Sequence, residues 1–221
     1  MSTVVFFHAH PDDEALASGG TMARMDDEGH RVVLVVATRG EEGEPVAGVL
    51  VDGEALGDRR TTAVHEAASI LGVARVAFLD YRDSGMADDP ANDHPGCFWQ
   101  ADVESATDRL GMVLADEEVD VLIVYDSHGG YGHPDHIQVH RVGTSWARRG
   151  AANGGRPIRL RWVTMNRDVI RTSFDAAVAA AETAAAAGEE AWSDEAMLEL
   201  RRERAESDSF GLPDTEITHG V

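Results

Sequence analysis

Short apolar runs alternate with longer segments of mixed polarity along most of the chain. Five runs rich in β-branched and aromatic residues are typical of buried strands; they cover residues 4–7, 32–36, 75–79, 119–124 and 160–164. The segments between them are long enough for helices, and some carry apolar residues three and four apart; they cover residues 13–28, 59–71, 102–115 and 136–149. This alternation predicts an α/β fold, Rossmann-like, with a mostly parallel sheet and helices on both faces.

Two stretches interrupt the alternation, and the end of the chain changes in character. Residues 41–58 are acidic and contain glycine, and residues 81–99 are rich in Asp, Pro, Gly and aromatics, so we expect functional or mobile loops there. Residues 176–187 are almost all alanine and residues 194–207 alternate acids with arginines, which predicts two exposed helices. Because no linker or repeat divides the chain, we expect one domain over residues 1–221.

Composition narrows the classes of partner. The 221 residues include 40 acids and 19 Lys or Arg, a formal net charge of −21, which argues against nucleic acid or an anionic membrane surface as the main partner. Cys97 is the single cysteine, which excludes an intrachain disulfide and favours a reducing compartment. No stretch has the length of a membrane span and no secretory signal begins the chain, so we expect a cytoplasmic protein.

A dense polar group, within AHPDDEALASGG, follows the first predicted strand. His10 comes just past the strand, Pro11 makes the turn, and the acids at 12–14 open the next helix. One interpretation is a helix cap, because Asp is a favoured N-cap and acids in a first turn suit the helix dipole. The other is a metal site, because His10 and Asp13 together fit a divalent ion such as zinc. Ligands in parallel sheets bind beyond the carboxyl ends of strands, which favours the metal site.

A second group, YDSHGGYGHPDH, follows the strand predicted at residues 119–124. Pro134 suits the first position of a helix, and His133 and His136 lie three residues apart on one helical face. With the first group, it supplies two imidazoles and one carboxylate, a pattern typical of catalytic zinc with an open position for water. We therefore expect a metal held by His10, Asp13 and His136.

The neighbours of these residues offer proton-transfer chemistry. Asp12 could take a proton from water, His133 could stabilise or protonate the departing groups, and Asp135 could hold a histidine in orientation. G-x-S-x-G and HExxH are absent, and the third glycine of a dinucleotide-binding motif is missing, so those activities are not favoured. The remaining candidates are expected to be structural or loop residues: His8, His128, His140 and Cys97.

The paired motifs AHPDDEALASGG and YGHPDH resemble the PIG-L/LmbE-like family of zinc-dependent N-deacetylases. TRGEEGE, YRDSGM and FGLPDTEIT are similar to its branch of mycothiol-pathway deacetylases and mycothiol-conjugate amidases. ALASGG stands where the amidases have a lysine in SKGA, which favours the deacetylase side. The resemblance covers residues 4–140 well and extends more loosely to 217. It implies a single LmbE-like deacetylase domain, and relatives that continue past Val221 imply a missing C-terminal segment.

The resemblance also implies a function and a division of roles. The function is metal-dependent removal of an N-acetyl group from an N-acetylated amino sugar or glycoconjugate, such as N-acetylglucosaminyl-inositol. The alternatives are an amidase acting on a thiol conjugate and a non-catalytic metal- or sugar-binding relative. A small amino sugar is the implied partner, and formation of a homo-oligomer stays open. The implied roles are zinc or Fe²⁺ binding by His10, Asp13 and His136, general base by Asp12, oxyanion stabilisation by His133 and Tyr131, and sugar-hydroxyl binding by Arg60 (or Arg59) and Asp83.

Overall fold

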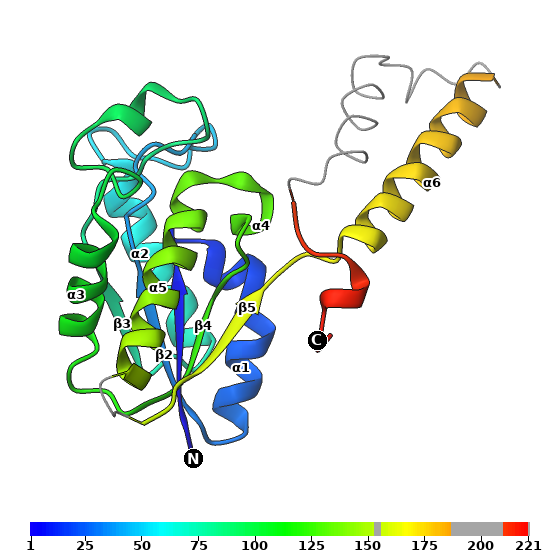
Figure 1. The fold of residues 1–221 in the computed structure, drawn as a ribbon. Coiled ribbons are helices and arrows are strands. Elements are labelled where there is room, and N and C mark those ends of the chain that lie inside the picture. Colours follow the sequence, from blue (N-terminus) through cyan, green and yellow to red (C-terminus); the bar gives the residue numbers. More distant parts are fainter. Residues whose placement is uncertain (153–155, 187–209, 221) are drawn as a thin grey trace. The chain divides into compact units, whose positions relative to one another are not determined.

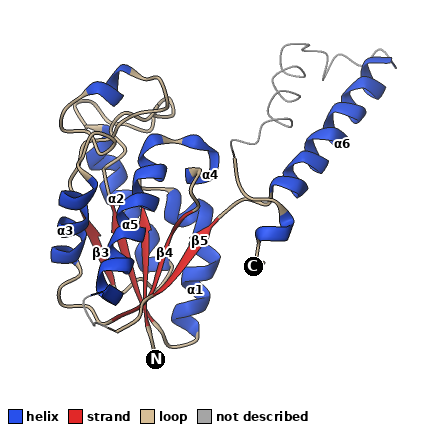
Figure 2. Cartoon of the chain, viewed as in Figure 1, coloured by secondary structure: helices blue, strands red, loops and turns tan. Residues whose placement is uncertain are grey.

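The computed structural model describes residues 1–152, 156–186 and 210–220. These residues form a five-stranded parallel sheet in the order β3-β2-β1-β4-β5 (Figures 1 and 2). The strands are β1 (Thr3–His8), β2 (Arg31–Val36), β3 (Arg75–Phe78), β4 (Val119–Tyr125) and β5 (Arg159–Val163). Each predicted strand is confirmed, with ends that differ by one residue at most.

Helices connect the successive strands, as predicted. They are α1 (Gly19–Asp27), α2 (Leu56–Ile70), α3 (Val103–Val113) and α5 (Pro134–Ala152). The helix predicted at 13–28 is divided, since a π-helical turn, η1 (Glu14–Ser18), precedes α1. Of the two tail helices, the first is part of the longer α6 (Arg167–Ala186), and the one predicted at 194–207 falls outside the described residues.

Alternate residues of the central strands enter two separate hydrophobic cores. Val5 and Phe7 of β1 pack with side chains of α3 and α5, whereas Val4 and Phe6 pack with side chains of α1 and α2. All four are 3% exposed or less, and full burial of such a side chain contributes about 1.5–3 kcal/mol. Helices therefore cover both faces of the sheet, which confirms the predicted α/β architecture (Figure 1).

The strand order places β1 beside β4 near the centre of the sheet. From this pair the chain moves outward in both directions, to β2 and β3 on one side and to β5 on the other. Such a reversal opens a crevice at the carboxyl ends of the two strands. The two polar clusters follow β1 and β4, so both begin at this position.

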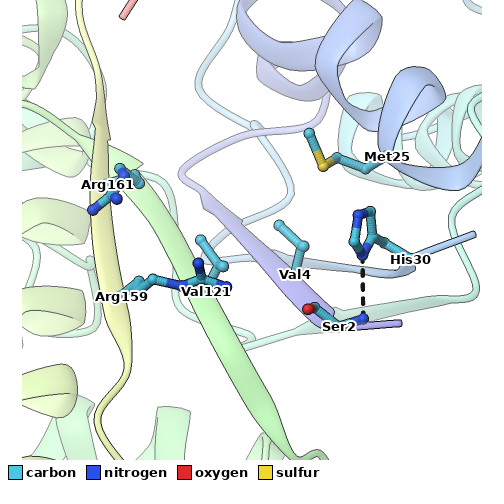
Figure 3. Close-up of a pocket in the computed structure, with 7 residues that line it drawn as sticks. All are labelled: Ser2, Val4, Met25, His30, Val121, Arg159 and Arg161. Carbon is cyan, nitrogen blue, oxygen red and sulfur yellow. Dashed lines mark hydrogen bonds between the residues drawn. The ribbon is translucent and has the colours of Figure 1, made fainter. Parts of the chain in front are cut away.

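A hollow of about 270 Å³ lies elsewhere in the molecule (Figure 3). Its lining comes from α1, β1, β4 and β5 and from the residues that flank them: Ser2, Val4, Met25, His30, Val121, Arg159 and Arg161. The Ser2 N–H donates to His30 Nδ1 at 3.1 Å. None of the predicted site residues lines this hollow.

The contacts of the chain divide it into two compact units, Met1–Val163 and Thr164–Val221. In the second unit, the Arg167 guanidinium donates to the carbonyls of Phe210 and Gly211 at 2.9 and 2.7 Å. The single domain expected over residues 1–221 stays a prediction. No helix in the described ranges is long and apolar enough to cross a membrane.

Candidate metal and active site

Asp13 lies at the start of η1 but does not cap it. Its carboxylate makes no capping hydrogen bond. Instead, Oδ2 accepts the His10 N–H at 2.9 Å and lies 3.5 Å from His10 Nδ1, while Oδ1 lies 3.4 Å from His136 Nε2. The carboxylate thus stands between an imidazole that follows β1 and another from α5, and the helix-cap interpretation of Asp13 is not supported.

Backbone contacts define the protonation of His136. Its Nδ1 lies 3.1 Å from the carbonyl oxygen of Gly129, which can only accept, so Nδ1 carries a proton. The neutral ring therefore presents a lone pair at Nε2. This nitrogen is buried and has no hydrogen-bond partner among the residues that the structure describes. A lone pair there would repel the Asp13 carboxylate, so the position calls for a proton on Nε2 or a metal ion between the two groups.

His10 has the same arrangement with its nitrogens exchanged. Nε2 lies 3.3 Å from Asp135 Oδ2 and 3.5 Å from Asp83 Oδ1, so Nε2 carries a proton and Nδ1 faces Asp13. Burial lowers the pKa of His10, but hydrogen bonds with Asp13, Asp135 and Asp83 raise it well above its usual value. These buried acids favour positive charge at this position.

His133 differs from the other two histidines. Its Nδ1 accepts the Asp135 N–H at 3.1 Å, so the proton of the neutral ring is on Nε2. Burial, together with the nearby charges of His10 and His136, lowers the pKa of His133 to about 3. The ring centroid lies 4.5 Å from that of His10 and 5.0 Å from that of His136. His133 therefore directs a ring nitrogen at a backbone N–H, whereas each of the other two directs a ring nitrogen at the Asp13 carboxylate.

The donor set can hold a divalent metal. Potential ligand atoms lie within 4.8 Å of one another in two groups of described residues, His10–His133–His136 and His10–Asp83–Asp135. A third combination places the Asp13 carboxylate between His10 Nδ1 and His136 Nε2, which lie 3.5 and 3.4 Å from its two oxygens. Two imidazoles and one carboxylate suit zinc or ferrous iron.

Asp12 is held beside this group in an unusual backbone conformation, with φ at 115°. Its Oδ2 accepts from the Arg60 guanidinium at 2.5 Å, and the same guanidinium donates to the Gly40 carbonyl at 2.8 Å. Burial raises the pKa of Asp12, although the positive charge of Arg60 opposes this shift. Arg60, expected at sugar hydroxyls, thus contacts the expected base, while Arg59 pairs with Glu54.

The structure places Tyr131 at the surface and Asp83 in the interior. Tyr131 lies in the short helix α4 (Gly129–Gly132), is 51% exposed, and has its ring centroid 6.2 Å from that of His133. Asp83 is 3% exposed, and its oxygens accept the N–H groups of Gly85 and Glu42 at 2.9 and 3.2 Å. Asp83 therefore joins two loops over the site and is not presented to solvent.

Three further residues support the site and were missed in the sequence. Ser84 donates to Asp135 from both its hydroxyl and its N–H, and the Tyr125 ring stacks on His136 with the centroids 4.1 Å apart. Glu14 accepts the Asp12 N–H at 2.9 Å. Ser84 and Glu14 are each next to a predicted site residue, and Tyr125 directly follows a predicted strand. Nothing in the local sequence pattern distinguishes these supporting residues from ordinary polar positions.

The residues predicted to be structural lie in supporting positions. His8 bridges the Tyr125 hydroxyl and Ser18 Oγ at 2.9 and 2.7 Å, and burial lowers its pKa to about 4. His140 Nδ1 contacts the Tyr125 carbonyl at 3.0 Å, and the Cys97 thiol is buried. His128 lies in the turn after β4.

Much of the chain is similar in sequence to known proteins. The PIG-L family model, described as GlcNAc-PI de-N-acetylase, matches residues 5–147. A 1D-myo-inositol 2-acetamido-2-deoxy-alpha-D-glucopyranoside deacetylase of Thermobifida fusca is 47% identical over 148 residues, 63% of this chain and 52% of the relative. The protein of the same name from Acidothermus cellulolyticus is 42% identical over 187 residues, 80% of this chain and 59% of the relative. The chain therefore spans a little over half the length of these relatives.

Solved structures show the same fold. A conserved protein from Thermus thermophilus has a TM-score of 0.51 and 26% identity, over 72% of this chain and 63% of that one. The 4-carboxy-2-hydroxymuconate hydratase of Pseudomonas putida has a TM-score of 0.54 and 23% identity, over 74% and 64% of the two chains. Because the fold also occurs in a hydratase, the fold alone does not determine the reaction. The family match covers well over half of the chain, and the chain belongs to the PIG-L (GlcNAc-PI de-N-acetylase) family.

Proposed function

We propose that the protein is a metal-dependent hydrolase that removes the N-acetyl group from an N-acetylated amino sugar or glycoconjugate resembling N-acetylglucosaminyl-inositol. The observation that carries this proposal is the division of the three buried imidazoles. His10 and His136 each direct a ring nitrogen towards Asp13, whereas His133 presents an N–H. Metal-assisted amide hydrolysis uses a cation site, and a donor directed at the oxyanion accelerates it further. Relatives named as deacetylases of this glycoside agree with it.

His10, Asp13 and His136 would hold the metal, which we propose to be zinc, with ferrous iron as the alternative. Zinc supplies Lewis acidity to a carbonyl oxygen and to water. The buried Asp135 accepts from His10 Nε2 and keeps Nδ1 directed at Asp13. The Gly129 carbonyl accepts from His136 Nδ1 and keeps Nε2 of that ring directed at Asp13. The chain thus orients both imidazoles before any ligand is bound.

Asp12 would act as general base. Its carboxylate remains about half exposed beside the buried group and can take the proton of an attacking water. The raised pKa makes it a slightly stronger base than an ordinary aspartate. The proton then has to reach the departing nitrogen, and Asp12 or His133 would deliver it.

His133 and Tyr131 would stabilise the oxyanion of the tetrahedral intermediate. The neutral His133 ring offers Nε2–H, and Tyr131 lies in a glycine-rich turn where Gly130 has φ at 74°. Arg60 would donate to a sugar hydroxyl from N–H groups other than the two that bond to Asp12 and to the Gly40 carbonyl. Asp83 would need to accept through a remaining lone pair, since its backbone partners occupy the others.

The test combines elemental analysis with a substrate panel. The purified protein should contain stoichiometric zinc or iron and release free amine from N-acetylglucosaminyl-inositol. Release of amine only from a thiol conjugate would instead indicate an amidase. Bound metal with no amine from any N-acetylated sugar or conjugate would contradict hydrolysis and favour a binding protein. A cytoplasmic, reducing location stays a prediction from the single cysteine.

A further inference from the structure

Asp12 has a backbone conformation that an aspartate does not adopt without support. A φ of 115° lies in a region populated almost only by glycine, and such a residue persists only where its surroundings hold it. The Asp12 carbonyl accepts the N–H groups of Ala15 and Leu16, both at 3.0 Å, so the start of η1 holds one side of the residue. The other side, its N–H, donates to Glu14 Oε2 at 2.9 Å.

Glu14 is an unusual residue to find in this position. It is 2% exposed, and within the described part of the chain it has no cationic partner. A buried carboxylate without a cation is destabilising, and burial accordingly raises the pKa of Glu14. Its carboxylate accepts the N–H of Asp12, the residue with the strained backbone, and its own backbone N–H is a second donor beside it.

We infer that Glu14 is a positioning residue that holds Asp12 at positive φ and thereby aims the Asp12 carboxylate at the reacting water. This inference rests on the proposed function of Asp12 as general base. At negative φ, the Cα–Cβ bond of Asp12 would no longer have the direction that now brings its carboxylate to Arg60. Glu14 acts through an acceptor oxygen, so its charge is not required.

Two substitutions of similar volume test whether Glu14 acts through its acceptor oxygen or through its negative charge. Glu14→Gln keeps an oxygen that can accept the Asp12 N–H, whereas Glu14→Met fills the same space without one. We expect Glu14→Met to lower kcat by about 10²-fold, the effect of a misplacement of about 1 Å, with KM and metal content unchanged. Glu14→Gln should retain kcat to within a few-fold. Equal kcat values in the two variants would overturn the inference.

Glu54→Ala is the matched control, because Glu54 also accepts a backbone N–H, that of Val51 at 3.1 Å, on a loop. It should leave kcat unchanged. A loss of kcat as large as that of Glu14→Met would show that any such glutamate contact affects turnover, and would contradict a specific role for Glu14.

A second readout does not depend on activity. Asp12→Gly and Asp12→Ala both remove the carboxylate, but only glycine is unstrained at this φ, so the Gly variant should have a Tm higher by about 2–4 °C. In the Glu14→Met background, residue 12 can relax and the difference should disappear. A difference of equal size in both backgrounds would overturn the inference. If the protein releases no amine from any substrate, the proposed function fails while this thermal comparison still decides the role of Glu14.

Discussion

The two edges of the sheet, at the amino and carboxyl ends of its strands, hold charged groups in opposite ways. At the amino ends of the strands, the Glu117 carboxylate accepts two hydrogen bonds from Arg31, both at 2.9 Å, and one from Arg75 at 3.3 Å. Arg31 begins β2, Arg75 begins β3, and Glu117 lies just before β4. Every charge in this group has an opposite partner, and the group joins three strands.

At the carboxyl ends, the polar groups are left partly unsatisfied. His136 Nε2 has no hydrogen-bond partner among the described residues, and Asp12 has a strained backbone. Buried groups in this state are destabilising and concentrate at functional sites. One edge therefore stabilises the fold, and the other keeps polar groups available to bind a ligand. Substitutions and ligand removal should therefore separate stability from activity.

Removal of the metal should have the largest effect. Dialysis against a chelator should reduce amine release to background, because it removes the metal that we propose for His10, Asp13 and His136. The fold should survive, since the two hydrophobic cores are formed mainly by strand and helix residues, and Ala9 and Tyr125 are the core members that adjoin this group. Circular dichroism and Tm measure the fold, and added zinc should restore activity. Unfolding upon chelation would mean that the two edges are not separable.

Asp12→Ala should lower kcat by about 10²–10⁴-fold, the usual contribution of a general base. Metal content, measured by elemental analysis, should not change, because Asp12 is adjacent to the ligand set but not in it. Asp80→Ala is the control, since Asp80 also has a positive φ of 55° and pairs with an arginine, Arg39. Loss of metal from the Asp12 variant would contradict its role as base.

Asp135→Asn should weaken metal binding by about 10–100-fold, the usual effect of changing a partner of a ligating histidine. The amide cannot accept at both oxygen positions, so it loses either the His10 or the Ser84 contact. Competition with a chromophoric chelator measures the affinity. Asp102→Asn is the control, because Asp102 also accepts from a serine hydroxyl, that of Ser105, at 2.9 Å. An unchanged metal affinity in the Asp135 variant would show that Asp135 does not support the metal site.

Glu117→Gln should have the smallest effect, and on stability alone. We expect a loss of about 1 kcal/mol in the free energy of unfolding at pH 7, because the charged hydrogen bonds to Arg31 are weakened, with kcat unchanged. Urea denaturation measures the first quantity, and the amine assay measures the second. A fall in kcat would show that the amino edge influences the site.

The contribution of Glu117 to the stability of the fold should also depend on pH. Hydrogen bonds from Arg31 lower the pKa of Glu117 below its usual 4.5 in the folded protein. Its contribution to stability is therefore fully present above about pH 4.5 and is lost as the pH falls through the folded pKa. The stability difference between the wild type and Glu117→Gln should shrink in that window. A constant difference down to about pH 3 would contradict the shift.

The sequence by itself determined the five strands, their connecting helices and the positions of the two polar clusters. These follow from periodicity along the chain, and β1 and β4 each end where a cluster begins. Parallel strands then bring the clusters together, because carboxyl ends share one edge of the sheet. His10, Asp13 and His136 therefore could be predicted as one group.

Only the tertiary structure decided how these groups are oriented and protonated. Arg60 lies 48 residues from Asp12 and was expected at a sugar, yet it contacts that carboxylate. The three histidines have the same local signal in the sequence but differ in which nitrogen is free. That difference depends on the Gly129 carbonyl, the Asp135 carboxylate and the Asp135 N–H. Periodicity places a residue at an edge, whereas a hydrogen-bond partner a few ångströms away is determined by how loops pack.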